Sequence, residues 1–313
     1  MRRVICSLFL CLSGMVLQAH STNLFKVPDT LNKERFALVC GTQAAIWGGS
    51  MVALNKAWYA NYPRSKFHFY NDSKEWLQVD KIGHGWSAYW GAQFSTALFR
   101  WSGVKKKNAA LYGAGMGIAY VTVIEILDGF SAEWGFSVGD IAANTGGALL
   151  FSVQEYAWGE QRIQYKFSSQ FKKYPDAELQ QRADHLYGSS IPERILKDYN
   201  HQTYWLSVNP SSFMKHTKFP KWLNIAVGYG ADGMYGGYSN VGFDKMSNQF
   251  FNLNREARIR QCYLSPDIDL SRITIKGKTP AVLKALHFLK LKIPMPTLEL
   301  NSKGQLKGHL IYF

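Results

Sequence analysis

Four long segments rich in apolar and small residues occupy the first half of the chain. They cover residues 36–59, 81–101, 108–127 and 138–158, and each is about as long as a membrane-spanning helix. None is strongly apolar, because every segment also carries amide, hydroxyl or charged side chains. The pattern predicts a block of four helices over residues 36–158, joined by short loops.

Small residues recur in the third and fourth segments at spacings typical of closely packed helices: Gly113, Gly115 and Gly117, then Gly146, Gly147 and Ala148. Tryptophans such as Trp101 and Trp158 stand at segment ends, and a basic run follows at 105–107, as at a membrane interface. For this helical block, a bundle embedded in a membrane and a compact bundle resting on a membrane are equally compatible with the sequence. A fully soluble bundle is the third.

The second half of the chain has a different character. Residues 159–221 are polar and basic, with a helical patch at 177–188, and they indicate a connector. Alternation typical of strands then appears at 222–230, 256–264, 293–300 and 307–313, interrupted by a helix over 280–289. We therefore expect an α+β protein, in which a four-helix, membrane-associated or membrane-embedded block precedes a small β-rich region at 222–313.

The last strand ends on Phe313 and is similar to the C-terminal strand of outer-membrane β-barrels. Such barrels need at least about eight strands, and the sequence offers four or five candidates. A small sheet is therefore favoured, with the outer membrane kept as an alternative location.

The N-terminus is typical of an export signal. Arg2 and Arg3 precede a short apolar stretch, and a small residue before His20 allows cleavage, which predicts a signal peptide at 1–20. Neither Cys6 nor Cys11 follows the small residue that lipidation requires. The mature chain is thus expected on the periplasmic side of the envelope. Its two cysteines, Cys40 and Cys262, form either one bridge or two buried thiols.

The formal net charge of +14 favours anionic partners. Because an exported chain rarely meets nucleic acid, membrane lipid or lipopolysaccharide is the expected partner and nucleic acid is not. An envelope protein is a second candidate, and solvated basic loops without any partner stay open.

Five polar residues in the helical block are candidates for a site. Asp80 and His84 lie one helical turn apart, Asp140 and Asn144 repeat that spacing, and Glu125 stands near the end of the third segment. Because consecutive helices alternate in direction, these residues meet at the same end of the block. Asp128, three residues after Glu125, lies close to that end as well.

Three interpretations of this set stay open. His84, with Asp80 and Glu125, could act as general base or nucleophile on a phosphate or ester. Asp80, His84, Glu125 and Asp140 could instead bind a divalent metal, the one cofactor that the sequence implies. In the third interpretation Asp80 and Asp140 cap their helices, and Asp128, Asp140 and Asn144 belong to a buried network that holds the helices together.

The order of these motifs resembles a known family. Asp80-Lys-Ile-Gly-His84, Glu125-Ile-Leu-Asp128 and Asp140-Ile-Ala-Ala-Asn144 resemble the YfiM-like family of uncharacterised bacterial envelope proteins, and are distantly similar to VanZ-like membrane proteins. The resemblance covers about 36–158 and implies a helical envelope module that uses these residues as one unit. It implies no established activity. We expect a structural or binding component of the envelope, and the alternative is a metal- or His-dependent hydrolase of an anionic lipid or phosphate-bearing substrate.

Overall fold

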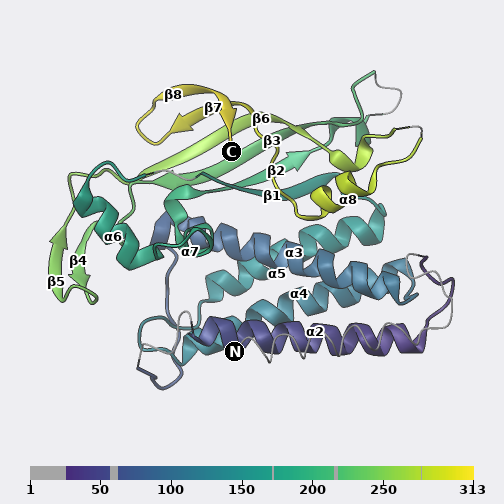
Figure 1. The fold of residues 1–313 in the computed structure, drawn as a ribbon, viewed down its shortest axis with the longest axis horizontal. Helices are drawn as coiled ribbons and strands as arrows, with labels where there is room; N and C mark the ends of the chain where they lie inside the picture. Colours follow the sequence, from purple (N-terminus) through teal and green to yellow (C-terminus); the bar gives the residue numbers. More distant parts are fainter. Residues whose placement is uncertain (1–25, 57–62, 171–172, 215–217, 276) are drawn as a thin grey trace.

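The computed structural model describes residues 26–56, 63–170, 173–214, 218–275 and 277–313. Within these ranges the chain forms a layer of long helices beside a curved β-sheet, and the helices and strands run roughly along the long axis of the molecule (Figure 1). The predicted α+β class is confirmed. The predicted signal peptide, residues 1–20, lies outside the described residues.

Each of the four predicted helical segments forms a helix. They are α2 (Lys33–Leu54), α3 (Val79–Trp101), α4 (Lys106–Gly129) and α5 (Val138–Ala157). Three shorter helices follow later in the chain, α6 (Ala177–Tyr187), α7 (Ile191–Lys197) and α8 (Ala281–Phe288). The described residues therefore contain seven α-helices, more than the four-helix block alone. Helices α6 and α8 lie where the sequence predicts a helical patch and a helix, and α7 was not predicted.

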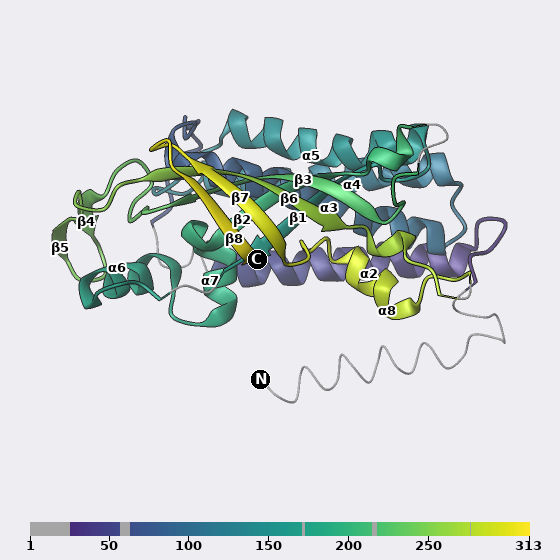
Figure 2. The same cartoon turned by 90° about the horizontal axis from the view of Figure 1, so that it is seen from above.

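The main sheet has six antiparallel strands in the order β1-β2-β3-β6-β7-β8. Their bounds are β1 (Ile163–Ser169), β2 (Gln202–Val208), β3 (Leu223–Asp232), β6 (Ile259–Ile268), β7 (Met295–Asn301) and β8 (Leu306–Tyr312). A separate hairpin of β4 (Val241–Asp244) and β5 (Gln249–Asn252) lies with α6 at one end of the molecule (Figure 2). Strands β1 and β2 fall in the range expected as a connector, so the sheet is larger than the sequence predicts.

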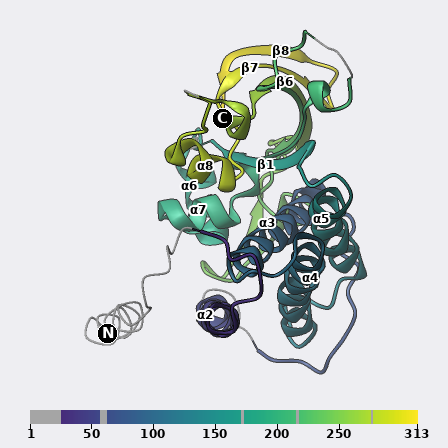
Figure 3. The ribbon, with the colours of Figure 1, turned by 90° about the vertical axis from the view of Figure 1, so that its right-hand side faces the viewer.

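Helix α3 lies between the sheet and the helices α4 and α5 (Figure 3). One of its sides packs on α4 and α5 through a cluster that includes Ala88, Tyr89 and Phe151. Its start packs on the sheet through a second cluster, in which Val79 meets Phe167 of β1 and Tyr204 of β2. Helix α3 therefore belongs to the cores of both halves of the chain. This packing fixes where the polar residues of α3 meet α4, α5 and the sheet.

Glycines allow the helices around α3 to approach closely. A Cβ atom built on Gly147 of α5 would lie 1.8 Å from the carbonyl oxygen of Gly85, and one on Gly113 of α4 would lie 2.0 Å from Thr96 Oγ1. No atom lies within 4 Å of the corresponding position on Gly115 or Gly146. A Cβ atom on Gly117 would lie 2.9 Å from the carbonyl oxygen of Ala88, so Gly113, Gly117 and Gly147 are required for packing, whereas Gly115 and Gly146 are not.

Among the helices of the described residues, α2 and α4 are long and apolar enough to cross a membrane. Length and composition of this kind also describe core helices of soluble proteins, so they do not establish an embedded block. Helix α2 packs loosely against the rest, and its buried residues are Arg35, Val39 and Gln43. It lies along the side of the helical layer that faces away from the sheet (Figure 1).

Two cysteines lie within the described residues, and they differ from both expectations. Cys40 on α2 and Cys262 on β6 are free, and both are exposed. The predictions of a bridge and of buried thiols are therefore wrong. The physical reason is that most of α2 is uncovered and that Cys262 occupies an exposed position of its strand.

The close crossing of α3 and α5 predicts a contrast between adjacent glycines. Replacing Gly147→Ala forces a methyl group into the Gly85 carbonyl and should lower the free energy of unfolding by about 1–3 kcal/mol. Gly146→Ala is the matched control, and it should be neutral or stabilising by up to about 1 kcal/mol, because alanine favours the helix and meets no atom. Urea denaturation measures both variants. Equal effects would show that the crossing tolerates a side chain.

Candidate functional site

The start of α3, the end of α4 and the start of α5 bring four predicted side chains together, which we call the polar cluster: Asp80, His84, Glu125 and Asp140. His84 Nδ1 lies 3.3 Å from Glu125 Oε1, and His84 Nε2 lies 3.9 Å from Asp80 Oδ2. One ligand atom each from Asp80, His84 and Asp140 lies within 4.8 Å of the other two. The convergence predicted from alternating helix directions is present in the structure.

A second group of residues holds Asp140 in place. Lys81 Nζ lies 3.1 Å from Asp140 Oδ1 and 2.5 Å from Asp72 Oδ1. Ser137 donates to Asp72 over 2.7 Å and accepts from the backbone N–H of Asp140 over 3.1 Å. Ser137 is therefore the N-cap of α5, and the Asp140 carboxylate pairs with Lys81 and does not cap the helix.

Asp80 does not cap its helix either. The N-cap of α3 is Gln78, whose side chain makes no capping hydrogen bond and whose backbone is left-handed. Asp80 instead accepts a hydrogen bond from the hydroxyl of Tyr199, which lies in the short 3₁₀ helix η3 (Tyr199–His201) just before β2. The second half of the chain thus contributes one hydrogen bond to the polar cluster.

Several buried polar atoms next to these contacts lack a hydrogen-bond partner. Glu125 Oε1 is one of them, because the nearby His84 nitrogen is not aligned to donate to it. Asn144 lies one turn after Asp140 and is fully buried, and neither its side-chain nitrogen nor its side-chain oxygen has a hydrogen-bond partner. Since an unpaired buried polar group costs about 1–3 kcal/mol, such a concentration points to a group that would satisfy it.

The electrostatics of the polar cluster are set by burial and by its excess of carboxylates. Burial raises the pKa of Glu125 to about 8 and that of Asp140 to about 7. Burial opposes the charging of His84, but the negative charges of Asp80, Asp140 and Glu125 outweigh it and raise the pKa of the imidazole. Burial therefore favours the protonated forms of Glu125 and Asp140.

Asp128 adds to the negative charge around the polar cluster. It is half-buried at the end of α4, and its charge raises the pKa values of both His84 and Glu125. Asn144 lies at the same end of the block but shows no hydrogen bond of its side chain to the other four residues.

Three residues that the sequence analysis did not select complete the arrangement: Asp72, Lys81 and Tyr199. Lys81 follows Asp80 directly in the second predicted helix. A basic residue at that helix end, where carboxylates from other helices were expected to meet, was a signal for an internal ion pair. Asp72 lies in the loop before α3 and Tyr199 is 119 positions away from Asp80. No spacing rule connects either of them to a helix end.

Comparison with known proteins adds one match. A family model described as predicted periplasmic lipoprotein (DUF2279) matches residues 68–156. The match supports an exported, uncharacterised domain of the bacterial envelope, and it contains the whole polar cluster but not Tyr199. No curated protein and no solved structure matches the chain significantly. The resemblances to YfiM-like and VanZ-like proteins stay predictions.

The raised pKa of Glu125 predicts a pH dependence of stability in the absence of metal. The folded chain keeps a proton on Glu125 up to about pH 8, whereas an unfolded glutamate, with its usual pKa of 4.5, has already released it. Unfolding is therefore favoured as pH rises through that window. The free energy of unfolding should fall between pH 5 and 8, by roughly a few kcal/mol in total. Glu125→Gln, measured by urea denaturation with chelator present, should give a shallower slope. The same slope in both proteins would contradict a buried, protonated Glu125.

Proposed function

We propose that this chain is a cell-envelope protein whose helical block binds one divalent cation at Asp80, His84 and Asp140. The observation that carries this proposal is the grouping of one imidazole and two carboxylates, from two helices, within 4.8 Å. In a tetrahedral site with ligands 2.0–2.1 Å from the ion, two ligand atoms lie about 3.4 Å apart. Small side-chain rotations would therefore bring the three groups to one ion.

The two nitrogens of His84 suit different roles in this arrangement. Nε2 is the nitrogen that faces Asp80, and it would bind the ion. Nδ1 faces Glu125, so Glu125 would accept the remaining ring proton and orient the imidazole. A carboxylate behind a metal-binding histidine is the usual arrangement in metal sites, and it assigns Glu125 to the second layer of the site rather than to the ion itself.

The choice of ion follows from the ligands. Imidazole nitrogen with carboxylate oxygens suits Zn²⁺ or Mn²⁺ better than Ca²⁺ or Mg²⁺, which prefer oxygen alone. Two positive charges would also offset the carboxylates that raise one another's pKa values in the polar cluster. The unpaired oxygen of Glu125 would gain a partner once His84 is fixed in the required orientation.

The polar cluster is open on one side. The side chains of Asp80 and His84 are each 21% exposed, whereas those of Asp140 and Glu125 are almost completely buried. Water or an anionic group could therefore complete the coordination from the exposed side. This opening favours a second candidate function, in which the ion activates water against a phosphate-bearing envelope substrate.

Metal analysis tests the cation site directly. Purified protein stripped with chelator and titrated with Zn²⁺ or Mn²⁺ in a calorimeter should bind about one ion per chain. His84→Ala and Asp140→Asn should abolish this binding, and Glu125→Gln should weaken it by roughly 10–100-fold because it removes the orienting carboxylate.

The matched control is His185→Ala. His185 lies 2.6 Å from Asp244 and therefore forms another histidine–carboxylate pair, on α6 and β4. The control variant should bind the ion as the unmodified chain does. If the unmodified chain binds no ion while Asp140→Asn greatly lowers stability, the polar cluster is a structural network that ties the helices together.

A further inference from the structure

The main sheet has its apolar side chains on the exposed face. Along β3, β6 and β7 the exposed positions alternate with buried ones, and the exposed positions hold mainly aliphatic residues: Ile225, Val227, Leu264, Leu298 and Leu300. The buried positions hold polar residues such as Asn224, Asp267 and Glu299. A water-soluble sheet places these two classes the other way round. Apolar-out and polar-in alternation is typical of strands that face lipid.

Buried polar contacts fix which face of the sheet points inward. Lys166 of β1 lies 2.6 Å from Asp267 of β6, and Ser207 of β2 donates to the same carboxylate over 2.6 Å. Lys292 donates to Ser265 over 3.1 Å from the segment before β7. These buried partners fix the strand register, because a shift by one residue would separate every pair. The aliphatic residues are thereby kept on the outside.

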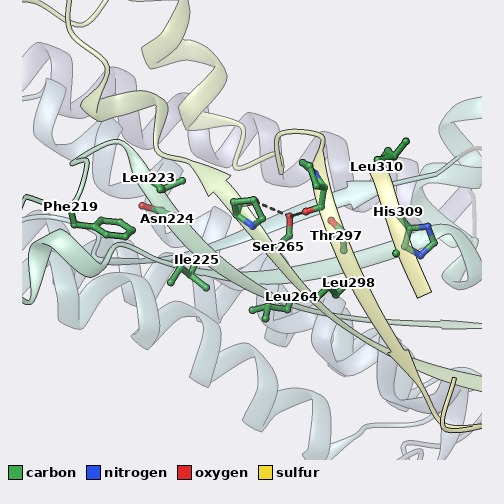
Figure 4. A pocket seen from close by; sticks show the side chains of 13 residues that line it. Phe219, Leu223, Asn224, Ile225, Leu264, Ser265, Thr297, Leu298, His309 and Leu310 are labelled. Atoms are coloured by element: carbon green, nitrogen blue, oxygen red, sulfur yellow. Dashed lines mark hydrogen bonds between the residues drawn. The ribbon is translucent and has the colours of Figure 1, made fainter. Parts of the chain in front are cut away.

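The helical layer covers only one part of the outer face. Tyr165 and Phe167 of β1 and Tyr204 of β2 pack against α3. The sheet then curves away from the helices, so that β6, β7 and β8 lie on the far side of the molecule (Figure 3). There the outer face forms an open groove of about 670 Å³. Its walls include Ile225, Leu264, Leu298 and Leu310, shown in Figure 4.

The charges around this surface indicate what covers it. The outward positions of β3, β6, β7 and β8 carry no acidic side chain within the described residues. Exposed Lys218 and Lys221 stand beside Phe219 and Trp222 where β3 begins, next to the groove. Basic and aromatic residues at the border of an aliphatic surface fit the headgroup region of an anionic bilayer. The net charge of +14 opposes contact with a second copy of the same chain.

We propose that the outer face of β3, β6, β7 and β8 docks on an anionic lipid bilayer. The face lies on the surface of the bilayer and does not cross it, because β8 is an open edge of the sheet whose backbone groups need water. This proposal is independent of the cation site, whose residues belong to α3 and α5. It adds an interaction surface to the second half of the chain.

A vesicle-binding experiment tests this surface. The full chain should sediment with vesicles of phosphatidylcholine and phosphatidylglycerol. The triple variant Leu264→Gln, Leu298→Gln, Leu310→Gln should bind at least about tenfold more weakly, since it removes three aliphatic side chains from the contact. All three side chains are about half exposed or more, with Leu310 at 88%, so the variant should keep its fold.

The matched control changes three exposed aliphatic residues on the helical layer: Leu111→Gln, Leu149→Gln and Val153→Gln. This control should bind vesicles like the unmodified chain. If it loses binding and the sheet variant does not, the helical layer is the docking surface and the proposal is overturned. Equal binding by all three proteins overturns it as well.

Cys262 provides a local reporter, because it lies between Tyr229 and Leu300 on the outer face and is exposed and free. With the other three cysteines replaced by serine, an environment-sensitive fluorophore on Cys262 should shift to shorter wavelength when anionic vesicles are added. A shift that depends on protein concentration without vesicles would identify a second copy as the occupant. No shift with vesicles would exclude contact between this face and lipid. Either result contradicts the proposal.

Discussion

The crossing of α3 with α5 is the constraint on which the arrangement of the helical block depends. At Gly147 the two backbones leave no room for even one carbon atom, and Gly113 imposes a similar limit on α4. Helices that approach so closely are held at one relative position along their axes, because a shift would bring larger residues into the crossing. His84 and Asp140 lie within one or two turns of that crossing. Their separation is therefore fixed by backbone contact and not by the flexible side chains themselves.

The fixed crossing forces acidic groups into a poorly hydrated space. Two carboxylates with strongly raised pKa values and one histidine share it, while Lys81 is already shared by Asp72 and Asp140. Burying these carboxylates lowers the stability of the fold, and apolar residues of similar volume could hold the same helices together. Such a group of shifted pKa values is therefore typical of a functional site. The exposed sides of Asp80 and His84 give the polar cluster access to solvent, which a purely internal network does not need.

The sequence was informative wherever one periodic pattern decided the structure. All four long helices and the strands β3, β6, β7 and β8 were predictable from apolar spacing, and the meeting of His84 with Glu125 followed from alternating helix directions. Strands β1 and β2 were missed because Gln164, Lys166 and Ser207 face a buried interior, so their strands have the composition of a surface region. Asp72 and Tyr199 were missed for another reason. Tertiary contact alone brings them to the helix ends.

The hydrogen bond between Tyr199 and Asp80 joins residues that are 119 positions apart, and this separation bears on how the chain assembles. An exported chain emerges from its translocation pore with the N-terminal part first, so the three helices can pack while Tyr199 is still inside the pore. Contacts between distant residues also form late in folding, since a long loop must close before they are made. Asp80 would thus pass through an interval in which it meets water in place of the phenol. During that interval the cluster is more accessible to solvent than in the finished fold, in which the side chains of Asp80 and His84 are each 21% exposed.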